Sequence, residues 1–168
     1  MTILVLSDSH GNCTALQKAV DLAGNVDAII HLGDGYRQMA HLRLPDVPVY
    51  FVLGNGEDMQ MMRRDDVKRE LLVDFEGIKI LMMHGHTHNV KFGVDRALMH
   101  AAELEADVLL FGHTHQPYHK KHRVFDKEID VFNPGSVGEP KFGSVGSFGI
   151  VTIRDGQLLF SWGEVDAC

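Results

Sequence analysis

Apolar runs alternate with amphipathic stretches along the first part of the chain. A strand is predicted at Thr2–Leu6, a run of apolar and β-branched residues. The next apolar positions repeat at i, i+3, i+4 and i+7, the spacing of one helix face: Leu16, Ala19, Val20 and Ala23. We expect Asn12 or Thr14 to cap this helix and Gly24-Asn25 to end it.

The rest of the chain adds further strands and a second helix. Apolar runs bounded by turn residues predict strands at Asp27–Leu32, Val49–Leu53, Leu71–Phe75, Ile78–Met83, Asp107–Phe111 and Ile129–Phe132. The helical spacing returns at Val94, Ala97, Leu98 and Ala101. The chain closes with a hairpin of Phe148–Ile153 and Gln157–Trp162 around Asp155-Gly156. Strands that alternate with helices in this way predict an α/β sandwich.

Length and composition are typical of one globular domain, here 1–168, with 45% hydrophobic and 23% charged residues. The net charge of −7 argues against recruitment to nucleic acid or an anionic membrane by bulk charge. Apolar runs are too short for a membrane-spanning helix, and the N-terminus lacks a signal-peptide pattern. Cys13 and Cys168 cannot build a disulfide framework, so we expect a cytoplasmic protein. A homo-oligomer stays open, with Met59–Met62 as a candidate contact.

The histidines are unevenly distributed along the chain. Eight of the eleven lie between His84 and His122. Imidazole is the commonest metal ligand and a frequent acid–base group in proteins. Whether these histidines serve as metal ligands or as acid–base groups therefore depends on where they lie relative to the strands.

Five of the predicted strands end in groups that bind metal ions through nitrogen or oxygen: Asp8 with His10, Asp34, Asn55, His84, and His113 with His115. In α/β sheets such groups collect outside the carboxyl ends of the strands, so these loops are expected to share one cleft. Side chains at i and i+2 of an extended segment share a face, which lets Asp8 and His10 serve one ion. Glycines next to the ligands, at positions 33, 54, 85 and 112, permit tight turns and close approach of an ion or phosphate.

These motifs resemble the signature of the calcineurin-like metallophosphoesterases, in the same order along the chain: Asp8-x-His10, Gly33-Asp34, Gly54-Asn55, His84-Gly85 and Gly112-His113-x-His115. With its length and the sequence Asn133-Pro134-Gly135-Ser136, the chain resembles their small single-domain bacterial and archaeal phosphodiesterase branch. The resemblance covers nearly the whole chain. It implies a four-layer α/β/β/α sandwich, in agreement with the predicted order of elements.

The resemblance also implies a pair of divalent metal ions. One ion would be held by Asp8, His10, Asp34 and His115. The other would be held by Asp34, Asn55, His84 and His113, with Asp34 bridging the two. Nitrogen and oxygen ligands without a thiolate fit Mn²⁺, Fe, Zn²⁺ or Ni²⁺, and Mn²⁺ is the first choice.

The activity implied is that of a phosphoesterase, and first of all a phosphodiesterase. A hydroxide bridging the ions would attack phosphorus in line, with Asp34, Asn55 and His84 acting through the metal centre. Two ions and two carboxylates leave the site with a charge of about +2, which favours an anionic phosphate ester as the substrate. The alternative is a protein-binding scaffold that keeps the fold with little or no catalysis. The complete set of ligands favours the enzyme.

At one position the chain departs from the family pattern. Many relatives follow Gly-Asn with a histidine that is taken to protonate the leaving group, whereas this chain has Gly56, Glu57 and Asp58. General acid catalysis is worth about 10²–10⁴-fold, so esters with poor leaving groups are expected to react slowly. This difference favours a phosphodiesterase over a monoester phosphatase. Glu57, or else Asp58, is expected to orient His10 or Asn55.

Two further histidines, His86 and His88, alternate with His84. If this segment is extended, all three side chains point into the cleft. His86 or His88 would then contact the phosphate or donate the missing proton. The alternative places both of them behind the ligands or at the surface.

The remaining candidates are expected to be structural. His31 lies on a strand and is expected to pack there, while His41 and His100 are expected on helical or loop surface. The basic run His119–Arg123 is expected to be the charged edge of a hairpin, with phosphate gathering as the alternative. Cys13 is expected to be a small buried residue of the first helix.

Overall fold

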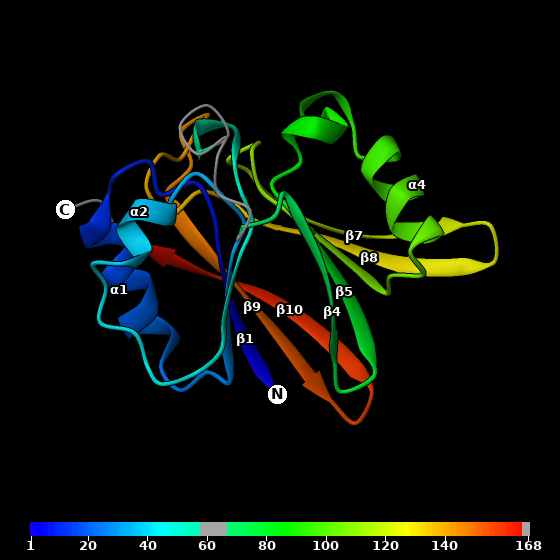
Figure 1. The fold of residues 1–168 in the computed structure, drawn as a ribbon, viewed down its shortest axis with the longest axis horizontal. Coiled ribbons are helices and arrows are strands. Elements are labelled where there is room, and N and C mark those ends of the chain that lie inside the picture. Colours follow the sequence, from blue (N-terminus) through cyan, green and yellow to red (C-terminus); the bar gives the residue numbers. More distant parts are fainter. Residues whose placement is uncertain (58–66, 166–168) are drawn as a thin grey trace.

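Two five-stranded sheets pack against each other in the computed structural model, which describes residues 1–57 and 67–165 (Figure 1). The first sheet has the order β10-β9-β1-β2-β3. Its strands are β1 Thr2–Leu6, β2 Ala28–His31, β3 Val49–Phe51, β9 Gly146–Arg154 and β10 Gln157–Val165. Strands β1, β2 and β3 run parallel, and the β9–β10 hairpin adds to β1 in the antiparallel direction.

The second sheet has the order β4-β5-β6-β8-β7. Its strands are β4 Glu70–Phe75, β5 Ile78–Met83, β6 Val108–Phe111, β7 Pro117–Val124 and β8 Lys127–Pro134. Strands β5, β6 and β8 run parallel, and β4 and β7 are antiparallel edge strands. The basic run His119–Arg123 lies on β7, so the prediction of a charged edge is confirmed.

Helices cover the outer faces of the sheets. They are α1 Cys13–Ala23, the short α2 Tyr36–Met39 and α4 Asp95–Glu103, with 3₁₀ turns η1 His86–His88 and η2 Val90–Phe92. Asn12 caps α1 as expected, because its side chain accepts a hydrogen bond from the backbone N–H of Ala15 at 3.0 Å. Cys13 is the first residue of α1 and is half-buried, so the prediction of a buried side chain is wrong.

Alternation along the central strands produces three apolar layers. On β1, Ile3 and Val5 face the other sheet, whereas Leu4 and Leu6 pack with α1. The same alternation on β6 directs its residues in turn towards the first sheet and towards α4. This arrangement is the four-layer α/β/β/α sandwich that was expected.

The predicted strands and both predicted helices are present, with ends that differ by a few residues. Helix α2 was not predicted, because its four residues are too short to show a helical period. Asp58 and Met59–Met62 lie outside the described residues. None of the helices in the described part of the chain has the length and apolar character needed to span a bilayer.

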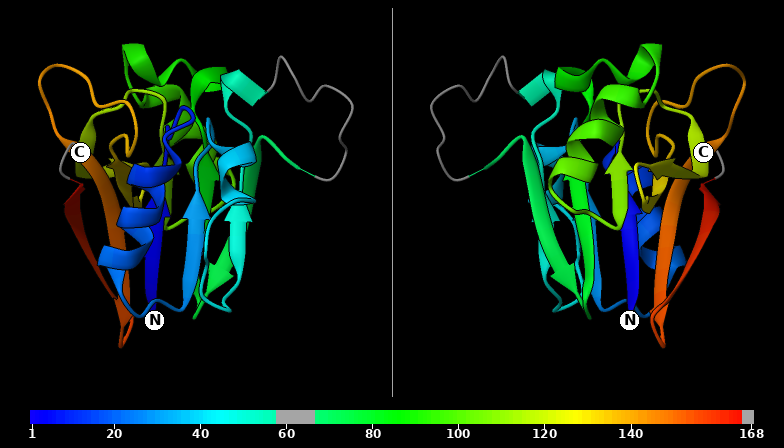
Figure 2. Two further views of the ribbon diagram at one scale, coloured as in Figure 1. Left: turned by 90° about the vertical axis from the view of Figure 1, so that its left-hand side faces the viewer. Right: turned by 90° about the vertical axis from the view of Figure 1, so that its right-hand side faces the viewer.

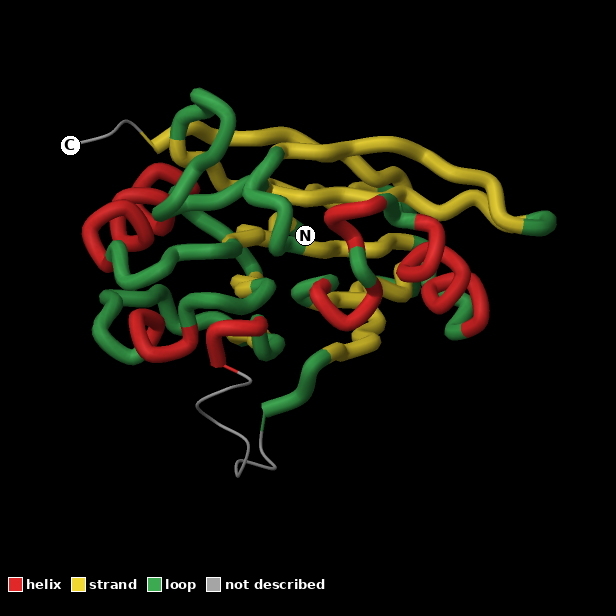
Figure 3. The backbone as a smooth tube through the Cα atoms, turned by 90° about the horizontal axis from the view of Figure 1, so that it is seen from above, coloured by secondary structure: helices red, strands yellow, loops and turns green. Residues whose placement is uncertain are grey.

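The parallel strands of both sheets bring the predicted ligands to one edge of the sandwich. Figure 2 shows the arrows of β1 (dark blue), β2 (blue) and β3 (cyan) pointing to this edge. Figure 3 shows this edge from above, with loops (green) and helices (red) lying over the strands. The site is therefore assembled between the sheets and belongs to neither one alone.

Candidate metal centre

One group of donor atoms comes from Asp8, His10 and His115. His115 Nε2 lies 3.1 Å from Asp8 Oδ1 and 3.2 Å from His10 Nε2. Asp8 and His10 follow β1 in the first sheet, and His115 follows β6 in the second. The three atoms converge on one point from two sheets.

A second group comes from Asn55, His84 and His113. His84 Nε2 lies 3.1 Å from both Asn55 Oδ1 and His113 Nδ1. His84 directly follows β5 and is fully buried, so its position is set by the core beneath it. These atoms converge on a second point, again from both sheets.

Asp34 joins the two groups. Its Oδ2 lies 3.7 Å from His10 Nε2 in the first group and 3.6 Å from His84 Nε2 in the second. Its other oxygen, Oδ1, accepts a hydrogen bond from the backbone N–H of Gly56 at 2.8 Å. One carboxylate oxygen is therefore held by the protein, while the other faces both groups.

The donor atoms fit divalent cations. Asp8 Oδ1 is buried and has no hydrogen-bond partner among the described residues, which is costly for an anionic oxygen unless a cation binds there. Metal–ligand bonds of about 2.0–2.2 Å place neighbouring ligand atoms roughly 3–3.5 Å apart. Four of the distances in the two groups, 3.1–3.2 Å, match that range, and the distance from His10 Nε2 to Asp8 Oδ1 is longer at 3.7 Å.

Ring orientation is set by the second nitrogen of two of the histidines. His84 Nδ1 contacts the carbonyl oxygen of Leu32 at 2.8 Å, and His115 Nδ1 contacts that of Glu139 at 2.5 Å. Because a carbonyl only accepts, both Nδ1 atoms donate. The Nε2 lone pairs are then directed into the site.

Charge and burial favour the metal-binding protonation states of Asp8 and His113, whereas the hydrogen bond with Asp8 raises the pKa of His10. Burial raises the pKa of the Asp8 carboxyl, but the His10 and His115 side chains outweigh burial and hold the pKa well below its usual range. Asp8 Oδ2 also accepts hydrogen bonds from Ser7 Oγ and the backbone N–H of His113. Burial, with the nearby His84, lowers the pKa of His113 to about 3, so its imidazole is neutral near pH 7.

The ligand loops have an unusual backbone. Five of the seven predicted ligands have φ between +44° and +66°, a region that non-glycine residues rarely adopt: Asp8, His10, Asp34, His113 and His115. The expectation that Asp8 and His10 share the face of an extended segment is therefore wrong. The chain turns sharply between them, and backbone hydrogen bonds from Asp8 N to Gly33 O and from His10 N to Asp34 O, both 3.0 Å, hold this turn.

Two glycines make room for the carboxylates. A Cβ at Gly54 would collide with the carboxylate of Asp34, and a Cβ at Gly112 would collide with the hydroxyl of Ser7 beside Asp8. The expected close approach of an ion or phosphate stays a prediction, while the structure shows that side chains of the chain itself need the space at these two glycines.

Glu57 holds the loop that carries Asp34. Its Oε2 accepts hydrogen bonds from the backbone N–H groups of Asp34 at 2.7 Å and Gly54 at 2.9 Å. Its Oε1 accepts from those of Gly35 at 2.6 Å and Tyr36 at 3.0 Å. The expected bond from Glu57 to His10 or Asn55 is therefore absent from the described contacts, and Glu57 instead binds the backbone of the loop that carries Asp34.

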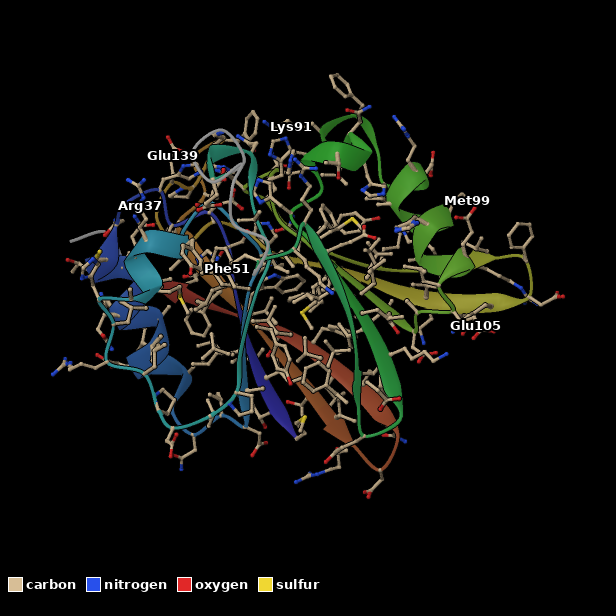
Figure 4. All side chains as sticks on the ribbon, viewed as in Figure 1. Arg37, Phe51, Lys91, Met99, Glu105 and Glu139 are labelled. Carbon is tan, nitrogen blue, oxygen red and sulfur yellow. The ribbon has the colours of Figure 1, made fainter. Side chains whose placement is uncertain are left out.

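Three charged residues around the centre were not predicted. Glu139 Oε2 lies 3.5 Å from His10 Nε2, and Arg37 lines a cavity of about 160 Å³ together with His10 and Asp34. Lys91 is close enough to His113 to lower its pKa. Arg37, Lys91 and Glu139 all lie in the upper part of Figure 4, near the edge where the loops meet. No strand-end pattern marks them, because they reach the site from α2, η2 and a loop.

The segment after His84 is not extended as expected. His86–His88 forms a 3₁₀ turn that begins after Gly85 at φ +101°. The His86 ring stays near the centre, 5.4 Å from the ring of His84 and 6.1 Å from that of His113. The His88 ring stacks on His100 at 5.1 Å, so the two side chains separate.

His31 packs beneath the centre, as expected for a structural histidine. It is fully buried, stacks on Phe51 at 5.1 Å, and its Nδ1 accepts a hydrogen bond from the backbone N–H of Gly33. Burial lowers the pKa of His31 to about 3. The folded protein therefore keeps this side chain neutral at pH values where the unfolded chain protonates it.

Replacing His31 by asparagine is expected to weaken the pH dependence of stability. Below pH 6.5, His31 is protonated in the unfolded wild type but stays neutral in the folded state. The free energy of unfolding therefore falls as the pH falls towards 3. The introduced asparagine keeps an acceptor for Gly33 but does not titrate. Between pH 7.5 and 4.5 the wild type should lose about 2–3 kcal/mol more than His31→Asn, measured by urea unfolding with a chelator present. Equal losses in the two proteins would contradict this account.

Comparison with known proteins agrees with this geometry. A family model described as the calcineurin-like phosphoesterase superfamily domain matches residues 1–156. The probable metallophosphoesterase YsnB of Bacillus subtilis is 34% identical over 160 residues, which cover 92% of this chain and 86% of that protein. Phosphodiesterase YfcE of Escherichia coli is 28% identical over 171 residues, covering 90% and 87% of the two chains.

The fold is shared as well. A solved structure from Streptococcus pneumoniae, described as a conserved protein and predicted phosphoesterase, superposes with a TM-score of 0.72 at 30% identity. The match covers 97% of this chain and 88% of the other. The chain therefore belongs to the calcineurin-like phosphoesterase superfamily and is a metal-dependent phosphoesterase.

Proposed function

We propose that the protein is a phosphodiesterase that works with two divalent cations. One would be held by Asp8, His10, Asp34 and His115, and the other by Asp34, Asn55, His84 and His113. The position of Asp34 Oδ2, within 3.7 Å of a histidine nitrogen in each group, is the observation that carries the proposal. Mn²⁺ is the first metal to test, and Fe²⁺, Zn²⁺ and Ni²⁺ suit the same ligands.

When bound, such a pair of ions supplies water activated for attack and positive charge for the phosphoryl oxygens. The chain's own residues position the side chains that would hold the ions. The backbone bonds of Glu57 hold the loop of Asp34, and the carbonyl oxygens that accept from His84 and His115 fix both rings. Arg37 and Lys91 add positive charge at the rim, which favours an anionic ester on an acidic protein.

A diester fits this site better than a monoester. Gly56 stands where many relatives have the histidine that protonates the leaving group, so esters with good leaving groups are favoured. A cavity of about 730 Å³ is lined by Lys91, Phe142 and Thr114, and Thr114 lies between His113 and His115 in the sequence. It offers space for the second ester group of a diester. A relative that matches most of the chain, YfcE, is named a phosphodiesterase.

His86 is the better candidate of the two extra histidines for a phosphate contact or proton donor. Its ring remains beside His84 and His113, whereas His88 turns to His100. Its assignment is part of the proposal, and His86→Ala would be expected to slow poor leaving groups more than good ones.

The metal-stripped protein is expected to hydrolyse bis(p-nitrophenyl) phosphate only after Mn²⁺ is added. The rate with p-nitrophenyl phosphate, a monoester of the same leaving group, should be lower under identical conditions. Release of p-nitrophenolate, followed spectrophotometrically with metal content measured in parallel, checks both statements. Absence of hydrolysis with Mn²⁺, Ni²⁺, Fe²⁺ and Zn²⁺ despite bound metal would contradict the proposal and favour a protein-binding scaffold.

A further inference from the structure

A second cluster of metal-binding side chains lies outside the centre described above. It consists of Glu70 at the start of β4, His88 in η1 and His100 in α4. One ligand atom from each lies within 4.8 Å of the other two, and all three residues are half-buried. His100 lies on a helix, as expected, and its side chain is 28% exposed.

The contacts of His100 resemble those of a zinc-binding histidine. Its Nε2 lies 3.0 and 3.2 Å from the two carboxylate oxygens of Glu70. Its Nδ1 faces Glu103 Oε2 at 3.8 Å on the opposite side of the ring. Metal-binding histidines usually present one nitrogen to the ion while a carboxylate or carbonyl orients the other.

His88 completes the cluster from a different element. Its ring stacks on that of His100 with an interplanar angle of 23°, and its Nδ1 contacts Thr87 Oγ1 at 3.1 Å. Burial, followed by the nearby His100, lowers the pKa of His88, so its imidazole is neutral near pH 7. A neutral imidazole is the form that binds a metal.

Charge and space around the cluster also suit a cation. A cavity of about 390 Å³ adjoins His88 and His100 and is lined further by Asp95, Arg96, Met99 and Glu103. Met99 marks this side of α4 in Figure 4. With Glu70, these residues carry three carboxylates against one guanidinium, so the surroundings are anionic.

We propose that Glu70, His88 and His100 form a separate mononuclear Zn²⁺ site with one coordination position open to the cavity. Two imidazoles and one carboxylate are a ligand set that binds zinc, with a fourth position left for water or an exogenous ligand. Mg²⁺ and Ca²⁺ prefer sites made entirely of oxygen. Binding would draw the three atoms from within 4.8 Å to the roughly 3–3.5 Å typical of shared coordination.

Such an ion would join three elements close to the phosphoesterase centre. Glu70 pairs with Met83 across β4 and β5, and Met83 directly precedes His84. His88 follows His84 by four residues, through the turn at Gly85. Zinc at this site would therefore tie α4 and η1 to β4 and stabilise the segment that carries His84.

Zinc stoichiometry tests the site directly. Full-length protein is stripped of metal, loaded with ZnCl₂, desalted, and its zinc measured by mass spectrometry per mole of chain. The wild type is expected to retain one more zinc ion per chain than His100→Gln and than Glu70→Gln. His119→Gln is the matched control, because His119 Nε2 contacts Asp130 at the same 3.0 Å but belongs to none of the three-residue clusters among the described residues.

Thermal unfolding is a second measurement, and it does not require the number of zinc ions bound at the candidate phosphoesterase centre to be known. Added Zn²⁺ should raise the melting temperature of wild type and His119→Gln by several degrees more than that of Glu70→Gln, since binding to the folded state stabilises it. Glu70→Gln keeps nearly the same shape, so the test survives if His100→Gln folds poorly. Equal zinc content and equal shifts in wild type and Glu70→Gln would overturn the proposal. Mn²⁺-dependent diester hydrolysis is measured separately, so this result does not bear on the proposed function.

Discussion

Asp34→Asn is expected to lower metal-dependent diester hydrolysis by at least about 10³-fold while the chain stays folded, since several kcal/mol of metal-derived stabilisation would be lost. The introduced asparagine would keep its amide oxygen on the backbone N–H of Gly56, which donates to Oδ1 at 2.8 Å in the wild type. The amide nitrogen, whose lone pair is delocalised into the carbonyl and does not bind metal ions, would then replace Oδ2 between His10 and His84. Both donor groups lose their shared ligand and the site loses one negative charge.

Asp155→Asn is the matched control for this experiment. Asp34 has φ +56° and Asp155, at the β9–β10 turn, has φ +51°, a conformation that asparagine adopts readily. Both changes therefore remove one carboxylate without backbone strain. Hydrolysis rates with added Mn²⁺, metal content and circular dichroism would be measured on both variants. Wild-type activity in Asp34→Asn would show that Asp34 does not bridge two ions.

Glu57→Gln is expected to reduce both stability and activity. Each oxygen of the Glu57 carboxylate accepts two backbone N–H groups: Oε2 from Asp34 and Gly54, and Oε1 from Gly35 and Tyr36. Whichever oxygen becomes an amide nitrogen, two N–H donors lose their acceptor and face another donor. We expect a loss of about 2–5 kcal/mol in the free energy of unfolding. Because the loop beneath Asp34 loosens, hydrolysis should also fall about 10–100-fold.

Urea unfolding with a chelator measures the first effect, and kcat at saturating Mn²⁺ measures the second. Glu128→Gln is the control, because Glu128 is an exposed residue of β8 whose carboxylate contacts Lys121 at 3.9 Å. A stable Glu57→Gln protein with full activity would mean that the four backbone bonds do not position the bridging residue. Wild-type stability with lost activity would instead indicate a direct role for Glu57 in the chemistry.

These two variants separate the proposed bridging ligand, Asp34, from the residue that holds its loop, Glu57. Asp34 contributes an oxygen to the space between the donor groups, whereas Glu57 acts only on the backbone that carries that oxygen. The same division is seen at Asp8, whose second oxygen accepts from Ser7 and from His113 N. In both cases one carboxylate oxygen is held by the protein and the other is directed into the site.

The order of elements and the candidate ligand residues can be predicted from the amino-acid sequence. Strands such as Thr2–Leu6 are continuous apolar runs, and α1 shows the helical period, because burial on both faces of a sheet or on one face of a helix imposes these patterns. Donor side chains placed directly after such strands predict a site because parallel strands deliver their carboxyl ends to one edge. The fold confirms the order of elements, and the structure brings Asp8, Asp34 and His84 together at that edge, whereas metal binding by these side chains stays a prediction.

The local path of the chain was decided only by tertiary contacts. Asp8 and His10 adopt positive φ values because backbone bonds to the Gly33–Asp34 loop of the neighbouring strand hold them there, and no local pattern encodes that partner. His86 and His88 alternate as in a strand, yet the left-handed turn at Gly85 places them in a 3₁₀ turn. Glu57 reaches the backbone N–H groups of Asp34, Gly35 and Tyr36 across a loop, which its spacing from Asn55 does not predict.

The amino-acid sequence alone therefore determined which elements form and which side chains are candidates for the chemistry, since hydrophobic period and residue type are local properties. The tertiary structure decided how those side chains meet: which atoms face each other, which loops bend, and which residues support them. Pairs such as Glu70 and His100, or His10 and His115, are distant in the chain and meet only after the two sheets pack. Because their contacts depend on the packing of whole layers, no local sequence pattern predicts them.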